Sequence, residues 1–440
     1  MNMSKTYRSV PVKRVEVEKV LAAHAGEFVE AGFDIGKRWV WTTIRFRDGT
    51  CLRPWRAGNP LEIGSLVDLL KQAGERVKLR VAMESSGTYG DPLRQALSDA
   101  GLDVHRVSSK ASHDWAEAFD GVPSQHDGKD AGVVAELCAM GKSVAWPLQR
   151  PTELEQELAY WVDQLDAAHR VQQVWIGRLE SRLARHWPEL GQERKLSAPT
   201  ILKALRHWGS PAALGADPQA AATLSRFSHR LLDQVGIDRL VQEAKQSVGV
   251  RMNAWDQRRV REDAEGALLA HRQKRAARRR LHELARRHEL IPALGEVVGI
   301  PTACVLWVCV GDPRHYGSGG AYRKAMGLNL AERSSGMYQG QLRISKRGKS
   351  LPRRFLYFAA LRYVCKQPVK RWYLEKKRRD GDGGMRGVVA VMRKLPLALH
   401  AAARGEAFDA ARLFKSIVNE VNNSNMRQQV QGGDARPKRQ

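Results

Sequence analysis

Two carboxylates stand where apolar strands are expected to end. Asp34 lies in FDIGKRWVWTTIRF and Glu84 lies in VAMESSGTYGDPL, each directly after a run of strand-forming residues. Aspartate is depleted from strands, and a carboxylate is costly to bury without a partner. A turn cap would explain either residue alone, whereas a shared role as metal ligands would explain both.

A second pair of carboxylates lies at the start of an expected helix. HDGKDAGVVAELCAMG carries Asp127 and Asp130, and residues three apart lie on one face of a helix. On a solvated helix such a pair merely favours the N-terminus. With Asp34 and Glu84, it would hold two divalent ions over a scissile phosphate, and oxygen ligands suit Mg²⁺ or Mn²⁺. We therefore interpret Asp34 as a metal ligand rather than a cap.

A third candidate site is the serine pair in ERSSGMYQG. Ser334 and Ser335 precede a glycine, and most such triplets form turns. A serine would attack a phosphodiester where cations or a metal stabilise the developing charge. The local cations are Arg333, Arg343, Lys346 and Arg347. No His or Asp partner is evident in the local spacing, so a turn and a nucleophile both remain open.

The order of the expected elements places the four carboxylates on one α/β layer. WVWTTIRF, VKLRVAMES and LDVHRVSS have strand composition, and PLEIGSLVDLLKQAGE has helical periodicity. Strands that alternate with helices over residues 28 to 145 predict a mixed sheet. Asp34 and Glu84 would then end two of its strands.

Beyond Pro151 the pattern becomes helical. Thr152 and Glu155 form a possible capping box, which predicts a helix start. The apolar residues that follow recur at steps of four and three, as in a heptad: Leu154, Leu158, Trp161, Leu165 and Ala168. This stripe fits a helix packed within its own domain about as well as a coiled-coil arm that pairs protomers.

The charge of the chain favours a nucleic-acid partner. Among 440 residues, Lys and Arg number 73 against 47 for Asp and Glu, which gives a net charge of +26 and a pI near 10.2. The stretch HRQKRAARRRLHELARRHEL, with eight Lys or Arg and two Glu, is too one-sided for internal pairing. We expect phosphate contacts from its centre, Arg278, Arg279 and Arg280.

Membrane and secretory classes are disfavoured. No apolar run reaches the length of a bilayer span, and the polar start MNMSKTYRSVPVKR lacks the apolar stretch of a secretory signal. Five scattered cysteines without zinc spacing indicate reduced thiols in a cytosolic protein. Basic C-terminal segments with interleaved aromatics suit a nucleic-acid backbone, and residues 416–440 predict a disordered basic tail.

Taken together, the motifs resemble those of the insertion-sequence-110 group of transposases, recombinases guided by a bridge RNA. They are FDIG, ESSGTY, HDGKDA, EVVGIPTA, GLNLAERSSG, ISKRG and VVAVMRKL, and they extend over nearly the whole chain. The resemblance implies α/β plus α architecture. After an N-terminal extension (1–27) come a RuvC-type, RNase H-like domain (28–148), a helical and coiled-coil region (151–290) and a transposase domain (291–415) with a helix-hairpin-helix-like segment.

The resemblance also implies the chemistry and the partners. Asp34, Glu84, Asp127 and Asp130 would bind Mg²⁺, and Ser335 would form a phosphoserine with DNA, with Ser334 as the adjacent alternative. The implied partners are DNA at the element ends and target site, a non-coding guide RNA, and further copies of the chain in a dimer or tetramer with a composite active site. The implied location is the prokaryotic cytoplasm, at the nucleoid.

The chain departs from the family at two places. Gln125 and His126 replace the lysine-threonine that precedes the first helical aspartate in the family, and the helical middle is longer than in compact members. Two other functions compete. A junction-resolving or RNase H-like nuclease predicts cleavage that survives Ser335→Ala, and a nucleic-acid-binding scaffold predicts binding without strand cutting.

Overall fold

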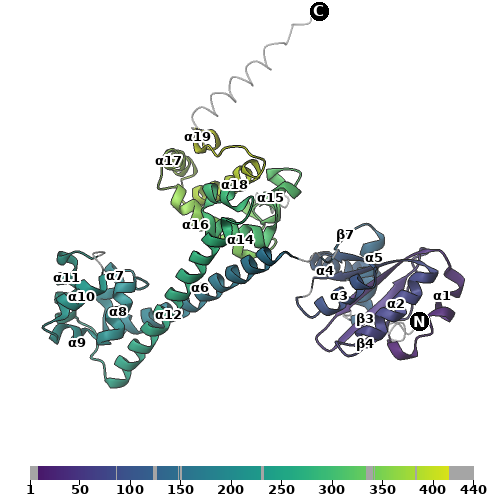
Figure 1. Cartoon of the computed structure of the whole chain (residues 1–440), viewed down its shortest axis with the longest axis horizontal. Coiled ribbons are helices and arrows are strands. Elements are labelled where there is room, and N and C mark those ends of the chain that lie inside the picture. Colours follow the sequence, from purple (N-terminus) through teal and green to yellow (C-terminus); the bar gives the residue numbers. More distant parts are fainter. Residues whose placement is uncertain are drawn as a thin grey trace, which may run out of the picture. The chain divides into compact units, whose positions relative to one another are not determined.

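The chain folds into two compact units, residues 1–150 and 151–440 (Figure 1). The computed structural model describes residues 8–85, 87–121, 126–146, 148, 151–228, 232–332, 340, 342–381 and 384–415. Each unit has its own apolar core, and each is described by itself below.

The first unit is built on one seven-stranded sheet. Its strands, in the order in which they lie side by side, are β1 (Val10–Pro11), β4 (Trp55–Gly58), β3 (Trp39–Arg45), β2 (Phe28–Ile35), β5 (Lys78–Glu84), β6 (Asp103–Val107) and β7 (Ser143–Ala145). β2, β3 and β4 form an antiparallel meander, and β5 and β6 continue the sheet parallel to β2. The predicted mixed sheet is confirmed, and the three strands expected from composition are β3, β5 and β6.

Helices cover both faces of this sheet. They are η2 (Val12–Arg14), α1 (Val17–Leu21), η3 (Ala22–His24), α2 (Ile63–Arg76), α3 (Asp91–Asp99), α4 (Ser109–Asp120) and α5 (Asp127–Ala139). On one face, Phe33 packs in a core with Leu66 of α2 and Leu93 of α3. On the other face, Ala82 packs with Val133 of α5. Because side chains alternate along a strand, each strand contributes residues to both layers.

The second unit is mostly helical in its described residues. Its helices are α6 (Glu153–His186), α7 (Pro188–Glu193), α8 (Pro199–Trp208), α9 (Pro211–Ala216), α10 (Ala220–Ser228), α11 (Gln234–Lys245), α12 (Ala254–Ala285), α13 (Ile291–Val298), α14 (Ile300–Val310), η4 (Pro313–His315), α15 (Gly319–Ala325), α16 (Ser350–Tyr363), α17 (Val369–Asp380), α18 (Met385–Ala402) and α19 (Ala410–Leu413). A short antiparallel pair, β8 (Leu330–Ala331) and β9 (Arg343–Ile344), interrupts them.

The long helices α6 and α12 lie side by side and connect two cores (Figure 1). The first half of α6 and the end of α12 share a core with α13–α18, whereas their other halves share a core with α7–α11. The predicted capping box at the start of α6 is confirmed: Thr152 Oγ1 accepts from the Glu155 amide at 3.3 Å, and Glu155 Oε2 accepts from the Thr152 amide at 2.8 Å. Leu158 and Leu165 of the heptad stripe are buried, so this stripe packs within its own chain.

The helices α13 and α14 form a sharp bend of 119° at Gly299. Gly299 has φ +85°, a backbone conformation that L side chains rarely adopt. Within the described ranges, no single helix has the length and apolarity to span a membrane, and only this bent pair passes that test as a pair. Its apolar residues Leu294, Val297 and Leu306 are buried in the core.

Candidate active site

The register of the sheet brings Asp34 and Glu84 to one edge. Phe33 of β2 pairs with Met83 of the parallel strand β5, so the next residues, Asp34 and Glu84, are neighbours on one face. Phe33 and Met83 point into the core beneath α2, which leaves the two carboxylates on the face that carries α5. As the sequence predicts, Asp34 is the penultimate residue of β2 and Glu84 is the last residue of β5.

Gly32 allows α5 to pack directly on this face. A Cβ on Gly32 would lie 2.0 Å from the carbonyl oxygen of Ala131 and 2.5 Å from the amide nitrogen of Ala135. Only glycine permits backbones to approach so closely. Asp34 lies two residues beyond Gly32 on the same face, and Asp130 precedes Ala131. The close packing therefore brings a strand carboxylate and a helix carboxylate together.

The first turn of α5 is held in place by two contacts. His126 is the N-cap residue, and its Nδ1 accepts a hydrogen bond from the Gly128 amide at 3.1 Å. Lys129, which is 1% exposed, forms an ion pair of 2.6 Å with Asp120 at the end of α4. Sequence reasoning missed Lys129. The only signal in the sequence was its position between Asp127 and Asp130. Nothing in the local pattern identifies Asp120 as its partner.

Three of the four carboxylates form a cluster. Asp34, Asp127 and Asp130 have carboxylate oxygens that all lie within 4.8 Å of one another. Partial burial, together with the charges of the other three carboxylates, raises the pKa of Asp34 to about 6. Burial and the charges of Asp127 and Glu84 also raise the pKa of Asp130. Glu84 is outside the 4.8 Å group but is close enough to act on it electrostatically.

The donor set of this cluster fits a hard divalent cation. The candidate ligands are carboxylate oxygens, which suit Mg²⁺ or Mn²⁺ better than softer metals. The carboxylates repel one another, and a bound cation would relieve that repulsion. The charge of Lys129, which is also paired with Asp120, opposes the increase in the pKa of Asp130 but does not cancel it.

The predicted serine site is described only in part. Three of its residues lie outside the described part of the chain: Arg333, Ser334 and Ser335. In the sequence they stand between β8 and β9. Arg343 lies in β9, and Lys346 and Arg347 follow it, all three with exposed side chains. The Lys346 amide donates to the carbonyl of Gly327 at 3.0 Å, so the described cations follow the serine segment on an anchored turn.

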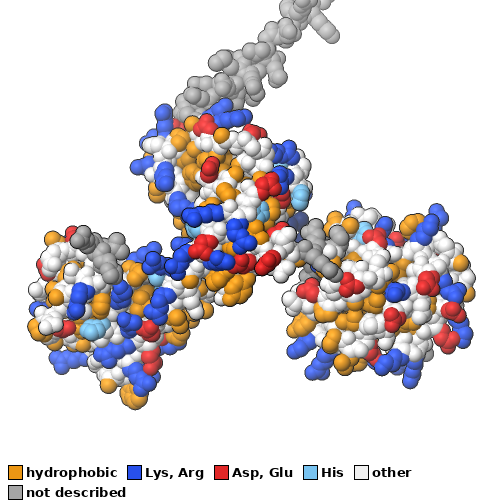
Figure 2. Space-filling model, in the orientation of Figure 1, with side chains coloured by type: hydrophobic (Ala, Val, Ile, Leu, Met, Phe, Trp, Pro, Cys, Tyr) orange, Lys and Arg blue, Asp and Glu red, His pale blue; other side chains and the backbone are white. Residues whose placement is uncertain are grey.

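The predicted arginines of α12 differ in their surroundings. Arg278 and Arg279 are exposed. Arg280 instead forms ion pairs with Glu157 of α6 at 2.7 Å and with Glu283 at 2.9 Å. Arg280 is therefore a weaker candidate for a phosphate contact than Arg278 or Arg279. Figure 2 shows Lys and Arg side chains along the α6 and α12 pair.

Two further cations lie near Arg278: Lys274, which belongs to the basic stretch singled out in the sequence, and Arg362, which sequence reasoning did not single out. Lys274 donates to Oε1 of Gln172, and burial and the charge of Arg278 lower the pKa of Lys274. Burial and the same charge lower the pKa of Arg362 in α16. Arg362 Nη2 donates to the carbonyl of Val298 at 2.8 Å, next to the bend between α13 and α14. These cations repel one another, and a bound polyanion would reduce that repulsion.

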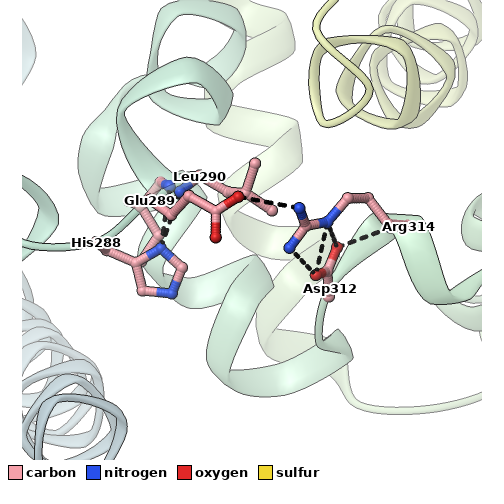
Figure 3. A network of polar contacts seen from close by, with 6 residues as sticks. His288, Glu289, Leu290, Asp312 and Arg314 are labelled. Carbon is pink, nitrogen blue, oxygen red and sulfur yellow. Dashed lines mark hydrogen bonds and ion pairs between the residues drawn. The ribbon is translucent and has the colours of Figure 1, made fainter.

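Another arginine of this unit is neutralised internally (Figure 3). Arg314 forms ion pairs with Asp312 at 2.9 Å and Glu289 at 3.0 Å. Beside them, His288 Nδ1 accepts from the Leu290 amide at 3.1 Å. This network links the segment before α13 to the segment after α14. Arg314 is thus better explained by local structure than by contact with nucleic acid.

Comparisons with known proteins are consistent with this geometry. Residues 31–188, which contain all four carboxylates, match a family of IS110 transposases of the DEDD type, described as Transposase. Residues 295–375, which contain the bend and the serine segment, match the family described as Transposase IS116/IS110/IS902. The insertion element IS110 uncharacterized 43.6 kDa protein of Streptomyces coelicolor is 26% identical over 327 residues, which cover 72% of this chain and 79% of that protein.

Proposed function

This chain belongs to the IS110 family of transposases, and from that premise we propose that it excises and inserts its own insertion sequence by site-specific strand exchange. Transposition requires that strands be cut at an element end and at a target and then joined to each other. The acidic cluster is the observation that carries this proposal, because clustered carboxylates at the ends of β2 and α5 suit phosphoryl transfer.

The proposed metal ligands are Asp34, Glu84, Asp127 and Asp130, with Mg²⁺ as the ion and Mn²⁺ as the alternative. A bound ion supplies positive charge that stabilises the phosphate and the leaving oxygen. The chain itself orients the carboxylates. The pairing of β2 with β5 places Asp34 beside Glu84, and the Gly32 contact sets the distance from β2 to α5. The ion pair of Lys129 holds the first turn of α5.

The proposed nucleophile is Ser335, with Ser334 as the adjacent alternative. Its Oγ forms a bond to phosphorus while the bond from phosphorus to the leaving strand oxygen breaks. The hydroxyl gives up its proton, and the leaving oxygen takes one up. The phosphoserine keeps the ester bond that later rejoining needs. Exposed cations that follow the segment, Arg343 among them, would stabilise the charge that develops on the phosphate.

The fold and the charge support the rest of the proposal. An antiparallel meander of β2, β3 and β4, continued by the parallel strands β5 and β6, supports an RNase H-like, RuvC-type first unit. A net charge of +26, with Arg278 and Arg279 exposed on α12, supports binding of element DNA, target DNA and a non-coding guide RNA. A dimer or tetramer, and a place at the nucleoid, rest on the family resemblance.

Strand transfer in vitro tests this function. The purified chain is incubated with Mg²⁺, the non-coding RNA transcribed beside its gene, DNA carrying the element ends, and target DNA, and junctions are sequenced. Donor–target junctions are expected with the metal, and none with EDTA or with Asp130→Asn. Cleaved ends without joined products would favour a metal-dependent nuclease. Binding without cutting would favour a scaffold.

A further inference from the structure

The face that carries Asp34 continues past the acidic cluster onto β3 and β4. Asp34 pairs with Trp41 of β3, and Trp41 pairs with Arg56 of β4. Directly paired residues point to the same face of a sheet. Val40 and Ala57, the sequence neighbours, are buried in the core on the opposite face. Asp34, Trp41 and Arg56 therefore form a row across three adjacent strands.

Trp39 extends this row. It lies two residues before Trp41 on the same face, and 39% of its surface is exposed. The guanidinium carbon of Arg56 lies 4.5 Å from the centroid of the Trp39 ring. A stacked guanidinium holds an indole in place and adds positive charge beside it. We call Trp39, Trp41 and Arg56 the tryptophan shelf.

Helix α5 leads away from the shelf. From its first turn beside Asp34, α5 runs back toward the beginning of β2, where Glu136 forms an ion pair with Arg45. Trp39 lies in the other direction. Its carbonyl accepts a hydrogen bond of 2.9 Å from the amide of Gly36, beyond the end of β2. The shelf thus lies next to the acidic cluster, on the side of Asp34 away from the body of α5. The N-cap residue His126 and the first residue of α5, Asp127, are exposed.

The rim of the shelf is anchored and cationic. Asn59 Nδ2 donates to the carbonyl of Gly36 at 2.9 Å and to that of Tyr89 at 3.2 Å, and the Asn59 amide donates to the carbonyl of Arg38 at 2.9 Å. These bonds join the turn after β2 to the loop after β5. Lys37 and Arg38 in that turn have exposed side chains. Exposed cations beside aromatic rings are the combination that single-stranded nucleic acid favours.

We propose that the tryptophan shelf receives an unpaired nucleobase of a DNA or RNA strand that runs past the acidic cluster. Binding of the base does not depend on the proposed function; only the cutting and joining of the bound strand does. Bases of every kind stack on indole and guanidinium planes, whereas paired bases are already stacked on each other. Trp55, on the opposite face of β4, is 3% exposed and serves packing. Trp39, in contrast, is not part of the apolar core of this unit.

Binding without metal tests the shelf separately from catalysis. The full chain is titrated in EDTA with short oligothymidylate, oligouridylate and a DNA duplex. Trp39→Ala is expected to weaken single-strand binding about tenfold, and Trp39→Phe, which keeps a ring, is expected to retain most of the affinity. Trp255→Ala is the matched control, because Trp255 is 66% exposed and lies under Arg258 at 5.7 Å in the second unit. Its affinity should equal that of the wild type.

Photo-cross-linking of the wild type supplies a second measurement that no folding defect can affect. A bromouracil-containing strand should cross-link to Trp39 or Trp41, as mapped by mass spectrometry, and the DNA and RNA probes show which strand is accepted. Unchanged single-strand affinity of Trp39→Ala, an equal loss for the duplex, or the absence of cross-links in residues 37–41 would each overturn the shelf. If one of these results is found and the protein still gives strand transfer, the shelf is refuted and the proposed function is not. If the binding and cross-linking results are as expected but no strand transfer is found, the proposed function is refuted and the shelf is not.

Discussion

A Cβ atom on Gly32 would lie 2.0 Å from the carbonyl oxygen of Ala131, closer than non-bonded atoms approach each other. Strand β2 and helix α5 therefore touch backbone to backbone beside the acidic cluster. Because the core is close-packed, a larger residue at position 32 can be accommodated only if α5 moves. This contact therefore helps to set the separation between Asp34 and the helical carboxylates.

Gly32→Ala should therefore lower both stability and metal affinity. We expect a loss of about 1–3 kcal/mol in the free energy of unfolding of the first unit. Mn²⁺ binding, measured by titration calorimetry, should weaken because the carboxylates separate. The control is Gly64→Ala in α2, where an added Cβ meets nothing within 4 Å and alanine favours the helix. Equal stability and metal affinity in the two variants would show that α5 moves freely.

The acidic cluster should make the metal-free chain sensitive to pH. Asp34 has a pKa of about 6 in the folded chain against 3.8 ordinarily, so its contribution to stability is full below 3.8 and is lost as pH rises through 6. Near neutral pH and in EDTA, Asp34→Asn should thus be more stable than the wild type by about 1–2 kcal/mol, after allowance for partial exposure. Thermal unfolding at several pH values measures the difference.

Saturating Mg²⁺ should reverse this order, because the wild type then gains binding free energy that Asp34→Asn has lost. The control is Asp68→Asn, which removes the same charge from an exposed position on α2. A stability gain in Asp34→Asn that does not change with pH, or that Asp68→Asn reproduces, would contradict the role of the cluster.

Lys129 and Lys110 provide a comparison between a buried and an exposed ion pair. Lys129→Met should destabilise the first unit by about 3 kcal/mol, because it removes the cation from an ion pair in which both side chains are largely buried. Lys110→Met breaks the pair with Asp114, in which both side chains are more than half exposed, and should cost less than about 1 kcal/mol. Urea denaturation measures both, and equal losses would contradict an anchoring role for Lys129.

The placement of the carboxylates at strand ends and at a helix start could be predicted from the sequence because those signals are local. An apolar run before Asp34 or Glu84 marks a strand end, and Asp127 opens a helix. Gly32 and Lys129 act through partners in other segments, Ala131 and Asp120, which strand or helix patterns do not identify. Their roles depend on where α5 and α4 dock against the sheet, and that is a property of the whole fold.

Strand register explains why the shelf was also missed. WVWTTIRF has strand composition whichever face Trp39 and Trp41 occupy, and a shift of one residue exchanges the faces. In the same way, the heptad stripe predicted a helical neighbour for α6 but not which one. The neighbour is α12 of the same chain, so some of its basic residues, such as Arg280, are used in pairing the two helices.

Arg278 and Arg279 should contact phosphates without reading bases. Replacing both by Gln should weaken DNA and RNA binding at all sequences and reduce the salt slope of the affinity by about two. The control is Arg258→Gln on the same helix, because Arg258 already pairs with Glu262 at 2.8 Å. Binding measured over a range of salt concentrations gives the slope. An unchanged slope in the double variant would leave these arginines as a solvated helix face.

Ser335→Ala separates a recombinase from a nuclease. A serine hydroxyl is a poor nucleophile at neutral pH and needs a base, a metal or concentrated positive charge beside it. With guide RNA, target DNA and Mg²⁺, the wild type should become covalently attached to a DNA strand, in an adduct that survives detergent and high salt. Ser335→Ala should bind RNA and DNA as the wild type does, yet give neither adduct nor recombinant product.

Ser334→Ala is the matched control, because it removes the same hydroxyl from the neighbouring position. It should retain the adduct, and mass spectrometry of the wild-type adduct should place the nucleotide on Ser335. Ser335→Cys should keep at most a trace of activity, since a thiolate can attack phosphorus but differs in size and metal preference. A nucleotide on Ser334, or on no serine, removes Ser335 from this role. Cleavage that persists in Ser335→Ala would make water the attacking group, because a metal ion held by the carboxylates would activate water without a serine.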